Sequence, residues 1–287
     1  MYLFIVPGVL YFVIFAYVPL IGNVVAFQDY SPFLGFNGRP WTGLKNFMDL
    51  FGDTEFRTAL KNTLLISLLQ IVFAFPAPIA LALLLNSLIS DRAKRFVQSV
   101  VYLPHFFGWV IVISIWQAVF GGVGPMATLL RHLGLGQVNL MADPHAFLGL
   151  ITAQVIWKEI GWGTIIFFAA ISAIPLERYE AAAVDGAGGW RRTWHITLPG
   201  ITNVIVLLFI LRLGAVLSVG FEQLLLQQRA VGAEAAEVLD TFGYFQGVVG
   251  GQWGLATAAG LVKGVVGTIL VISANRIAKR MGHGGLF

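Results

Sequence analysis

The sequence contains no cysteine and few charged residues. Without cysteine, a disulfide framework and a thiolate metal site are both excluded. Charged residues make up only 11% of the chain, whereas a soluble domain normally carries about 25%. The mean hydropathy is +0.81, so the composition predicts a polytopic membrane protein. The formal net charge of +4 does not indicate a nucleic-acid partner, because basic residues in so apolar a chain more often mark cytoplasmic loops.

Motifs that carry chemistry are also missing. No G-x-x-x-x-G-K-[ST] stretch occurs in the chain, so it has no P-loop with which to hold nucleotide phosphates. The five histidines are scattered without the spacing of metal ligands, and no Ser/His/Asp set can be assembled. We therefore expect no catalysis, no metal and no bound cofactor in this chain, and a partner that supplies the energy for whatever it does.

Six apolar segments are long enough to cross a bilayer, whose hydrocarbon core needs roughly 20 residues per helix. They cover residues 1–27, 59–86, 96–120, 146–174, 201–219 and 254–277. The first is too long for the apolar region of a signal peptide and lacks its basic start, so we expect a retained helix, bent at Pro7 and Pro19. Pro76 and Pro78 interrupt the second segment, which needs protein neighbours there. The sequence predicts an all-α integral membrane protein with about six transmembrane helices in a single transmembrane domain, residues 1–287.

Basic residues are distributed unevenly between the two sides of the membrane. The short loops after the second and fourth segments, with the end of the chain, hold Arg92, Lys94, Arg95, Arg178, Arg191, Arg192, Arg276, Lys279 and Arg280. The longer loops of the other side hold Arg39, Lys45, Arg57, Lys61, Arg131 and Arg229. Because short cytoplasmic loops are enriched in Lys and Arg, we expect the first set and both termini to be cytoplasmic. The long loops 28–58 and 221–253 then face outward.

The stretch 175–199, between the fourth and fifth segments, is polar and rich in helix-ending residues. Gly186 permits a left-handed turn after a first short helix. Trp190 and Trp194 are four residues apart and would share one side of a second short helix, which we expect Pro199 to end. The residues alone allow two interpretations: a loop anchored on lipid headgroups by its tryptophans, or a docking element that fits a groove on a partner.

The same stretch resembles the EAA signature of ABC importer permeases, E-A-A-x3-G-x9-I-x-L-P. Every fixed position matches at the family's spacing: Glu180, Ala181, Ala182, Gly186, Ile196, Leu198 and Pro199. The resemblance implies that residues 175–199 form the cytoplasmic coupling loop, which sits in a cleft of an ATPase subunit. It also implies that these residues, together with Asp185, make the ATPase contact. The predicted orientation independently places this loop in the cytoplasm.

Stretches elsewhere look like the carbohydrate-uptake branch of these permeases, so the similarity covers nearly the whole chain. They include residues 26–30, 43–47, 102–106, 161–164, 240–242 and the closing Gly-Gly-Leu-Phe at 284–287. One departure is Glu159, where the resemblance leads us to expect a small residue. The resemblance implies a bacterial inner-membrane subunit that passes a sugar or oligosaccharide into the cytoplasm by alternating access. The implied partners are a second homologous permease, two ATPase subunits that hold ATP and Mg, and an extracytoplasmic solute-binding protein.

Charged and aromatic residues inside the spans are the candidates for a substrate path. A charge at the bilayer centre costs at least about 2.5–3.5 kcal/mol, so each either bonds to a neighbouring helix or lines a polar route. The predicted path consists of Trp157, Lys158, Glu159, Trp162 and Arg212. The indole rings flank the charged pair, and an indole face beside polar groups suits a sugar ring. For a further charge, that of Lys263, a bond to a neighbouring helix is the favoured interpretation.

Alternative functions remain open at this point. An ABC importer permease for amino acids, phosphate or metal chelates shares every feature except the similarity to sugar permeases. A stand-alone secondary transporter or channel is disfavoured by the EAA-like loop and by the lack of a visible inverted repeat. A membrane-embedded enzyme is disfavoured because no catalytic set is present in the sequence.

Overall fold

The structure is a computed structural model that describes residues 4–34, 40–134, 136 and 138–282. Within these ranges every regular element is a helix, and one isolated antiparallel bridge joins Gln28 to Trp41. Six helices of this part of the chain are long and apolar enough to cross a membrane: Val6–Phe27, Thr54–Ser87, Trp109–His132, Phe147–Ser172, Gly189–Gly214 and Trp253–Arg280. The predicted all-α membrane architecture is thereby confirmed. Arg39 and the closing residues 284–287 lie outside the described ranges.

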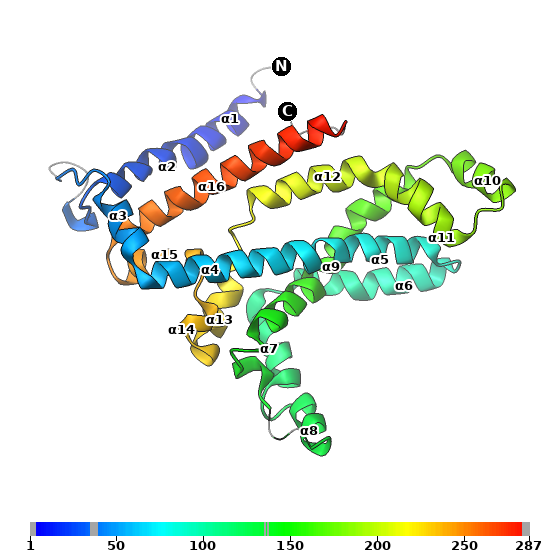
Figure 1. The fold of residues 1–287 in the computed structure, drawn as a ribbon, viewed down its shortest axis with the longest axis horizontal. Helices are drawn as coiled ribbons and strands as arrows, with labels where there is room; N and C mark the ends of the chain where they lie inside the picture. The colour runs from blue at the N-terminus through cyan, green and yellow to red at the C-terminus, as the bar shows by residue number, and fades with distance from the viewer. Residues whose placement is uncertain (1–3, 35–39, 135, 137, 283–287) are drawn as a thin grey trace. The chain divides into compact units, whose positions relative to one another are not determined.

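The chain divides into two compact units, which are described separately. The first comprises Met1–Lys61 and Glu237–Val266. Its helices are α1 (Val6–Phe12), α2 (Val18–Ile21), α3 (Lys45–Gly52), α15 (Leu239–Gly243) and the first parts of α4 (Thr54–Leu69) and α16 (Trp253–Arg280) (Figure 1). Short 3-10 segments at Gly22–Phe27 and Pro32–Leu34 and a π-helical turn at Tyr244–Val249 complete it. Phe56, Phe242 and Ala258 are fully buried in its apolar core.

Lys263 illustrates how this unit accommodates an intramembrane charge. Its ammonium group forms an ion pair with the carboxylate of Asp240 on α15. The expected bond between Lys263 and a neighbouring helix is therefore confirmed. A paired charge avoids the cost of an isolated one in an apolar surrounding.

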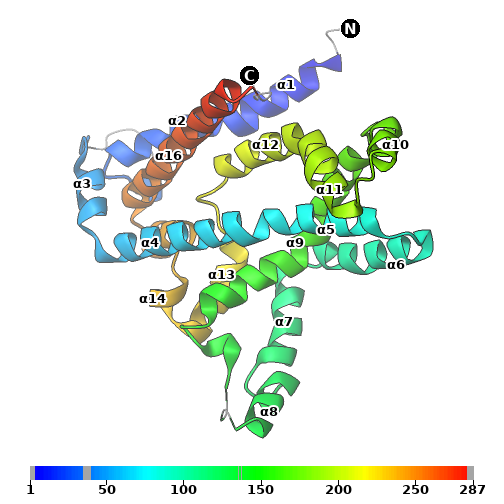
Figure 2. The same cartoon turned by 45° about the vertical axis from the view of Figure 1, so that its right-hand side comes forward.

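The second unit comprises Asn62–Ala236 and Gly267–Phe287. Besides the remaining parts of α4 and α16, it holds α5 (Pro76–Ser87), α6 (Asp91–Tyr102), α7 (Trp109–Phe120), α8 (Pro125–His132), α9 (Phe147–Ser172), α10 (Leu176–Val184), α11 (Gly189–Arg192), α12 (Leu198–Gly214), α13 (Phe221–Val231) and α14 (Ala233–Ala236). The long helix α9 is its centre, since α5, α6, α7 and α12 all pack on it. In both ribbon views α10 and α11 project from one end of this unit (Figures 1 and 2).

Gly161 permits the closest of these helix contacts. A Cβ atom built on Gly161 of α9 would lie 2.0 Å from the carbonyl oxygen of Val101 on α6. Only glycine leaves room for a backbone at that distance, which is the usual reason for glycine at a close helix crossing. Gly161 thus sets the distance between α6 and α9. It thereby also positions the residues that follow α6 in the chain.

Three π-helical turns precede prolines inside the spans. They are Val13–Tyr17 before Pro19, Gln70–Ala74 before Pro76, and Thr193–Thr197 before Pro199. In each case the N–H of the residue just before the proline donates to the carbonyl five residues earlier, as Phe75 does to Gln70 at 2.9 Å. Proline lacks an N–H and its ring clashes with the carbonyl four residues back, so a wider turn lets the helix continue past it.

Two of the predictions about prolines are wrong. Pro199 does not end a short helix, because one helical segment runs from Gly189 through the π-helical turn to Gly214. Pro7 does not bend its helix either, because it lies in the first turn of α1, where a missing N–H disturbs nothing. The bend expected at Pro19 corresponds to the π-helical turn before it.

The third predicted span, residues 96–120, is also corrected. Its first part belongs to α6 and to a 3-10 turn at Leu103–Phe106, and the helix that is long and apolar enough to span begins only at Trp109. The chain is extended at Phe107 and Gly108, and the buried Pro104 lies in the 3-10 turn. Hydropathy alone does not reveal this break in the helix, because every residue in it except His105 is apolar or small. The break places His105 beside α9.

Candidate functional site

The loop between α9 and α12 folds into two short helices around a glycine turn. At the end of α10 the N–H of Ala187 donates to the carbonyl of Ala182 at 2.8 Å, and the N–H of Gly186 donates to Ala183 at 3.1 Å. These two bonds define a Schellman motif. The motif needs a left-handed backbone conformation at the residue directly after the C-cap, which here is Gly186. Gly186 has φ of +73°, so the turn predicted there is confirmed.

A side-chain contact joins α10 to the π-helical turn η8 (Thr193–Thr197). The hydroxyl oxygens of Tyr179 and Thr197 are 3.0 Å apart, and the Thr197 hydroxyl also donates to the carbonyl of Arg192 at 3.4 Å. Thr197 is buried. The two arms of the loop are therefore linked to each other rather than free to separate.

The two arms enclose a hollow of about 410 Å³. Its lining includes five of the residues predicted to contact an ATPase: Ala181, Ala182, Asp185, Ile196 and Pro199. The other three, Glu180, Gly186 and Leu198, lie outside the lining. Trp190 and Trp194 are 74% and 52% exposed, with their rings 5.7 Å apart and edge to face. Both indoles therefore lie on one side of the helical segment that begins at Gly189, as predicted.

A second hollow lies inside the second unit, among the spanning helices. Its volume is about 480 Å³, within the range of roughly 300–1,000 Å³ that is common for ligand sites. Most of the lining is apolar. Its polar groups include Gln70 on the π-helical turn after α4, Glu159 and Trp162 on α9, Arg212 on α12, Ser218 after α12, and Gln223 on α13. We call this hollow the central cavity.

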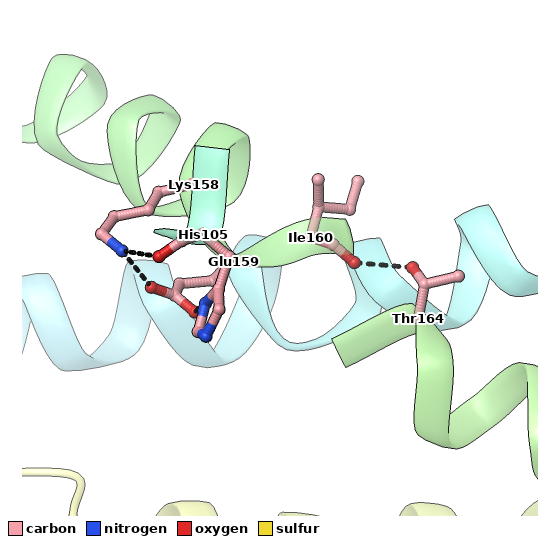
Figure 3. A network of polar contacts seen from close by, with 5 residues as sticks. All are labelled: His105, Lys158, Glu159, Ile160 and Thr164. Atoms are coloured by element: carbon pink, nitrogen blue, oxygen red, sulfur yellow. Dashed lines mark hydrogen bonds and ion pairs between the residues drawn. The ribbon is translucent and has the colours of Figure 1, made fainter. Parts of the chain in front are cut away.

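Glu159 is held in the cavity wall by a small polar network (Figure 3). Its two carboxylate oxygens lie 2.7 Å from Nδ1 of His105 and 3.2 Å from Nζ of Lys158. The Lys158 ammonium group also donates to the backbone carbonyl of His105 at 2.8 Å. The three residues form a closed ring of contacts between α9 and the turn that precedes α7. Glu159 keeps a partly exposed carboxylate next to the cavity, with its side chain 41% exposed.

Arg212 brings a positive charge to the same cavity. Its guanidinium group donates to the side-chain oxygen of Gln70, and the amide of Gln70 donates in turn to the carbonyl of Val219 at 3.3 Å. The end of α12 is tied in this way to the π-helical turn Gln70–Ala74. An arginine and a carboxylate in one cavity can bind hydroxyl groups as donor and acceptor, and the arginine can also bind a carboxylate or phosphate.

The predicted path residues do not all reach the cavity. Glu159, Trp162 and Arg212 line it, whereas Trp157 and Lys158 do not. Trp157 packs edge to face on Trp116 with ring centres 6.3 Å apart. Lys158 and Glu159 are adjacent in the sequence and point about 100° apart on an ideal helix, so they need not pair. In the structure they do, because Lys158 bends toward both Glu159 and His105.

Several polar residues of the site were not identified from the sequence. Gln70 and Gln223 line the cavity, and Gln223 belongs to a buried cluster in which its amide donates to Gln154 at 2.7 Å. Gln154 and Gln227 donate to each other, both at 3.0 Å. A search for polar amides in apolar spans, rather than for charges alone, would have found Gln70 and Gln154. His105 was recognisable only within the Tyr-Leu-Pro-His-Phe stretch, whose break in the helix was not predicted.

In the part of the chain that the structure describes, no group of three or more His, Asp or Glu side chains is arranged to hold a metal ion.

Comparison with known proteins identifies the family. Residues 74–283 match the family model described as the inner membrane component of binding-protein-dependent transport systems. Protein LplB of Bacillus subtilis (strain 168) is 46% identical and is matched over 100% of this chain and 91% of its own length. The polygalacturonan/rhamnogalacturonan transport system permease protein YteP of the same strain is 47% identical, over 100% of this chain and 90% of its own.

A solved structure gives the same answer for the fold. A chain of a bacterial alginate ABC transporter, in complex with a periplasmic protein that holds an alginate pentasaccharide, superposes with a TM-score of 0.92. It is 37% identical, and the match covers 99% of this chain and 96% of that one. The family match covers well over half of the sequence, and the helices agree over nearly its whole length. The chain therefore belongs to the family of inner membrane components of binding-protein-dependent transport systems, and it is a multi-pass membrane permease.

Proposed function

We propose that this chain is the permease subunit of an ATP-driven importer for acidic oligosaccharides. The observation that carries the proposal is the central cavity, where an indole, a carboxylate and a guanidinium group meet among the spanning helices. Sugars offer an apolar C–H face and many hydroxyl groups, which match an aromatic wall with donors and acceptors beside it. This combination of groups is less suited to an inorganic anion, because most of the cavity lining is apolar.

The acidic class follows from Arg212 together with the relatives. The named substrates of similar proteins are polygalacturonan, rhamnogalacturonan and alginate, and a solved relative with 38% identity is described as importing an acidic polysaccharide. Uronic acids carry a carboxylate, for which arginine is the preferred two-pronged partner. Arg212 is the candidate for that contact, since Lys158 does not line the cavity and its ammonium group already binds Glu159 and the carbonyl of His105.

The proposed complex contains a second homologous permease, two ATPase subunits that hold ATP and Mg, and an extracytoplasmic solute-binding protein. This chain supplies one transmembrane permease domain, residues 1–287, with residues 175–199 as its coupling loop. The basic residues of the short loops support a cytoplasmic position for the termini and for this loop. The binding protein would then meet the outward loops 28–58 and 221–253. The chain itself binds no nucleotide, in keeping with its lack of a P-loop.

Transport would proceed by alternating access, driven through the coupling loop. The ATPase can shift the permease only if its contacts favour one permease state over the other, and a swing from 1:99 to 99:1 needs about 5.5 kcal/mol of differential binding. The bond between Tyr179 and Thr197 lets α10 and the base of α12 receive that force together. Displacement of α12 would move Arg212, which lies near its other end.

The test is ATP-driven uptake into proteoliposomes that contain the complex purified with this chain as bait. We expect a second permease and an ATPase to copurify, and labelled trigalacturonate to enter faster than neutral maltotriose. Arg212→Gln should lower uptake of the acidic sugar. Faster uptake of the neutral sugar would overturn the acidic class. Uptake of amino acids, phosphate or metal chelates in place of any sugar would support the rival cargo, and accumulation without ATP would indicate a secondary transporter.

A further inference from the structure

The indole of Trp162 is fixed against the wall of the central cavity by the imidazole of His105. The two rings are stacked, with centroids 4.5 Å apart and planes only 6° from parallel. Trp162 lines the cavity, whereas His105 does not. The imidazole covers one face of the indole, and 48% of the residue Trp162 remains exposed. The edge of Phe106 also contacts it, with ring centroids 6.5 Å apart.

His105 is itself held in place at two points. Its Nδ1 atom contacts a Glu159 oxygen at 2.7 Å, and its backbone carbonyl accepts a bond from Lys158 at 2.8 Å. It belongs to the 3-10 turn Leu103–Phe106, whose Pro104 is buried. The ring is thus oriented by a hydrogen bond at one edge and by the backbone at the other. Rotation of His105 would break both the stack and the bond to Glu159.

Glu159 and Trp162 form one surface of α9. Residues three apart lie on the same face of a helix, and both line the cavity. Among the residues that the structure describes, each Glu159 oxygen has one protein partner, His105 or Lys158. Since a carboxylate oxygen can accept two hydrogen bonds, each retains one position for a hydroxyl group. An aromatic plane with a hydrogen-bond acceptor beside it is complementary to a pyranose ring lying flat.

We propose that Trp162 and Glu159 form a pyranose-binding subsite of the central cavity, and that His105 is its positioning residue. The indole would receive the C–H face of one sugar ring, and Glu159 would accept bonds from its hydroxyl groups. His105 does not contact the sugar. It stacks on the indole face that the sugar does not use, and its bond to Glu159 orients the carboxylate. This inference rests on the proposed function, but it concerns the sugar ring and not the acidic group, which is assigned to Arg212.

Two variants of His105 separate its two contacts. His105→Phe retains a flat ring to stack on Trp162 and removes the bond to Glu159, whereas His105→Ala removes both. Trp162→Leu removes the platform and Trp162→Phe keeps a smaller one. Trp157→Leu is the matched control, because Trp157 lies on the same helix but packs on Trp116 outside the cavity lining.

The measurement is the dependence of ATP-driven uptake on the concentration of the loaded binding protein and of the sugar. Loss of an aromatic stack should raise the KM of Trp162→Leu about tenfold with little change in the maximal rate. We expect His105→Ala to resemble it, His105→Phe to recover most of the loss, and Trp157→Leu to match the unmodified protein. Thermal denaturation of each purified complex checks that the variant is folded.

The outcomes are distinct. Unchanged KM in Trp162→Leu would overturn the subsite while leaving sugar import intact. An equal fall of the maximal rate and thermal midpoint in His105→Ala and His105→Phe, with unchanged KM, would show that His105 only supports packing. Absence of sugar uptake by the unmodified complex would overturn the proposed function and the subsite with it.

Discussion

The hydroxyl groups of Tyr179 and Thr197 lie 3.0 Å apart and join α10 to the π-helical turn that leads into α12. Tyr179 belongs to the EAA-like stretch, and Thr197 lies inside its closing Ile-Thr-Leu-Pro. The two ends of the motif are thus connected through Tyr179, which directly precedes Glu180, and through Thr197, which stands at a variable position between Ile196 and Leu198. This bond holds the two arms of the loop together, as its proposed coupling role requires.

Removal of that bond should loosen the loop without unfolding the permease. Tyr179→Phe and Thr197→Val should each destabilise it by about 1 kcal/mol. The double variant should lose less than the sum, because only one bond connects the two groups. Thermal denaturation of the four proteins measures the coupling. Thr202→Val is the control, since its hydroxyl bonds only to Leu198 within the same helix, and simple additivity of the first pair would contradict the predicted link.

Substitution of Gly186 tests the left-handed turn. Gly186→Val places a β-branched residue at φ +73°, a conformation that costs roughly 1–3 kcal/mol for such side chains. We expect normal insertion into the membrane but reduced copurification of the ATPase, because the angle between α10 and α11 changes. Gly189→Ala serves as the control: its Cβ would meet nothing within 4 Å and its backbone is helical. Equal recovery of ATPase with both variants would refute the role assigned to the turn.

Substitution of Gly161 tests the contact between α6 and α9. In Gly161→Ala the new methyl group would lie 2.0 Å from the carbonyl oxygen of Val101, so α6 must move away. Overpacking of this kind costs about 1–3 kcal/mol. Gly149→Ala, on the same helix but with open space around it, should be neutral or stabilising by up to about 1 kcal/mol. Thermal midpoints of the two purified variants decide, and equal values would show that α6 is not held by this contact.

The raised pKa of Glu237 predicts that the stability of the first unit depends on pH. Burial, followed by the nearby charges of Glu55 and Asp53, raises the pKa of Glu237 from its ordinary 4.5 to about 7. Between these two values the folded protein keeps a proton that the unfolded chain has lost. Stability should therefore fall as the pH rises through this window, and the loss should be complete above about pH 7.

The variant Glu237→Gln carries no ionisable group at this position. Its thermal midpoint should decline less than that of the unmodified protein between about pH 5 and about pH 8. Glu222→Gln, which removes an exposed carboxylate elsewhere, should keep the original decline. If the unmodified protein and Glu237→Gln lose stability in parallel, another group is responsible.

Sequence reasoning located most of the architecture because membrane spans are governed by a local rule. Residues 146–174 and 254–277 were predicted as spans, and helices occupy Phe147–Ser172 and Trp253–Arg280. Apolar length decides such segments, since a bilayer offers the backbone no other partner. The same rule failed between residues 96 and 108, where the break depends on Pro104, Gly108 and the helix they pack against.

The membrane class, the positions of most spans, the glycine turn at Gly186 and the family signature between Glu180 and Pro199 could all be predicted without a structure. Each of these depends on composition, on residue spacing or on the conformation of one residue. The structure was needed to show that Glu159, Trp162 and Arg212 share a cavity while Trp157 and Lys158 do not, and that His105 stacks on Trp162. Arg212 and His105 each lie fifty or more positions from these residues of α9. Helix packing and side-chain rotation bring them together, and no local pattern encodes either.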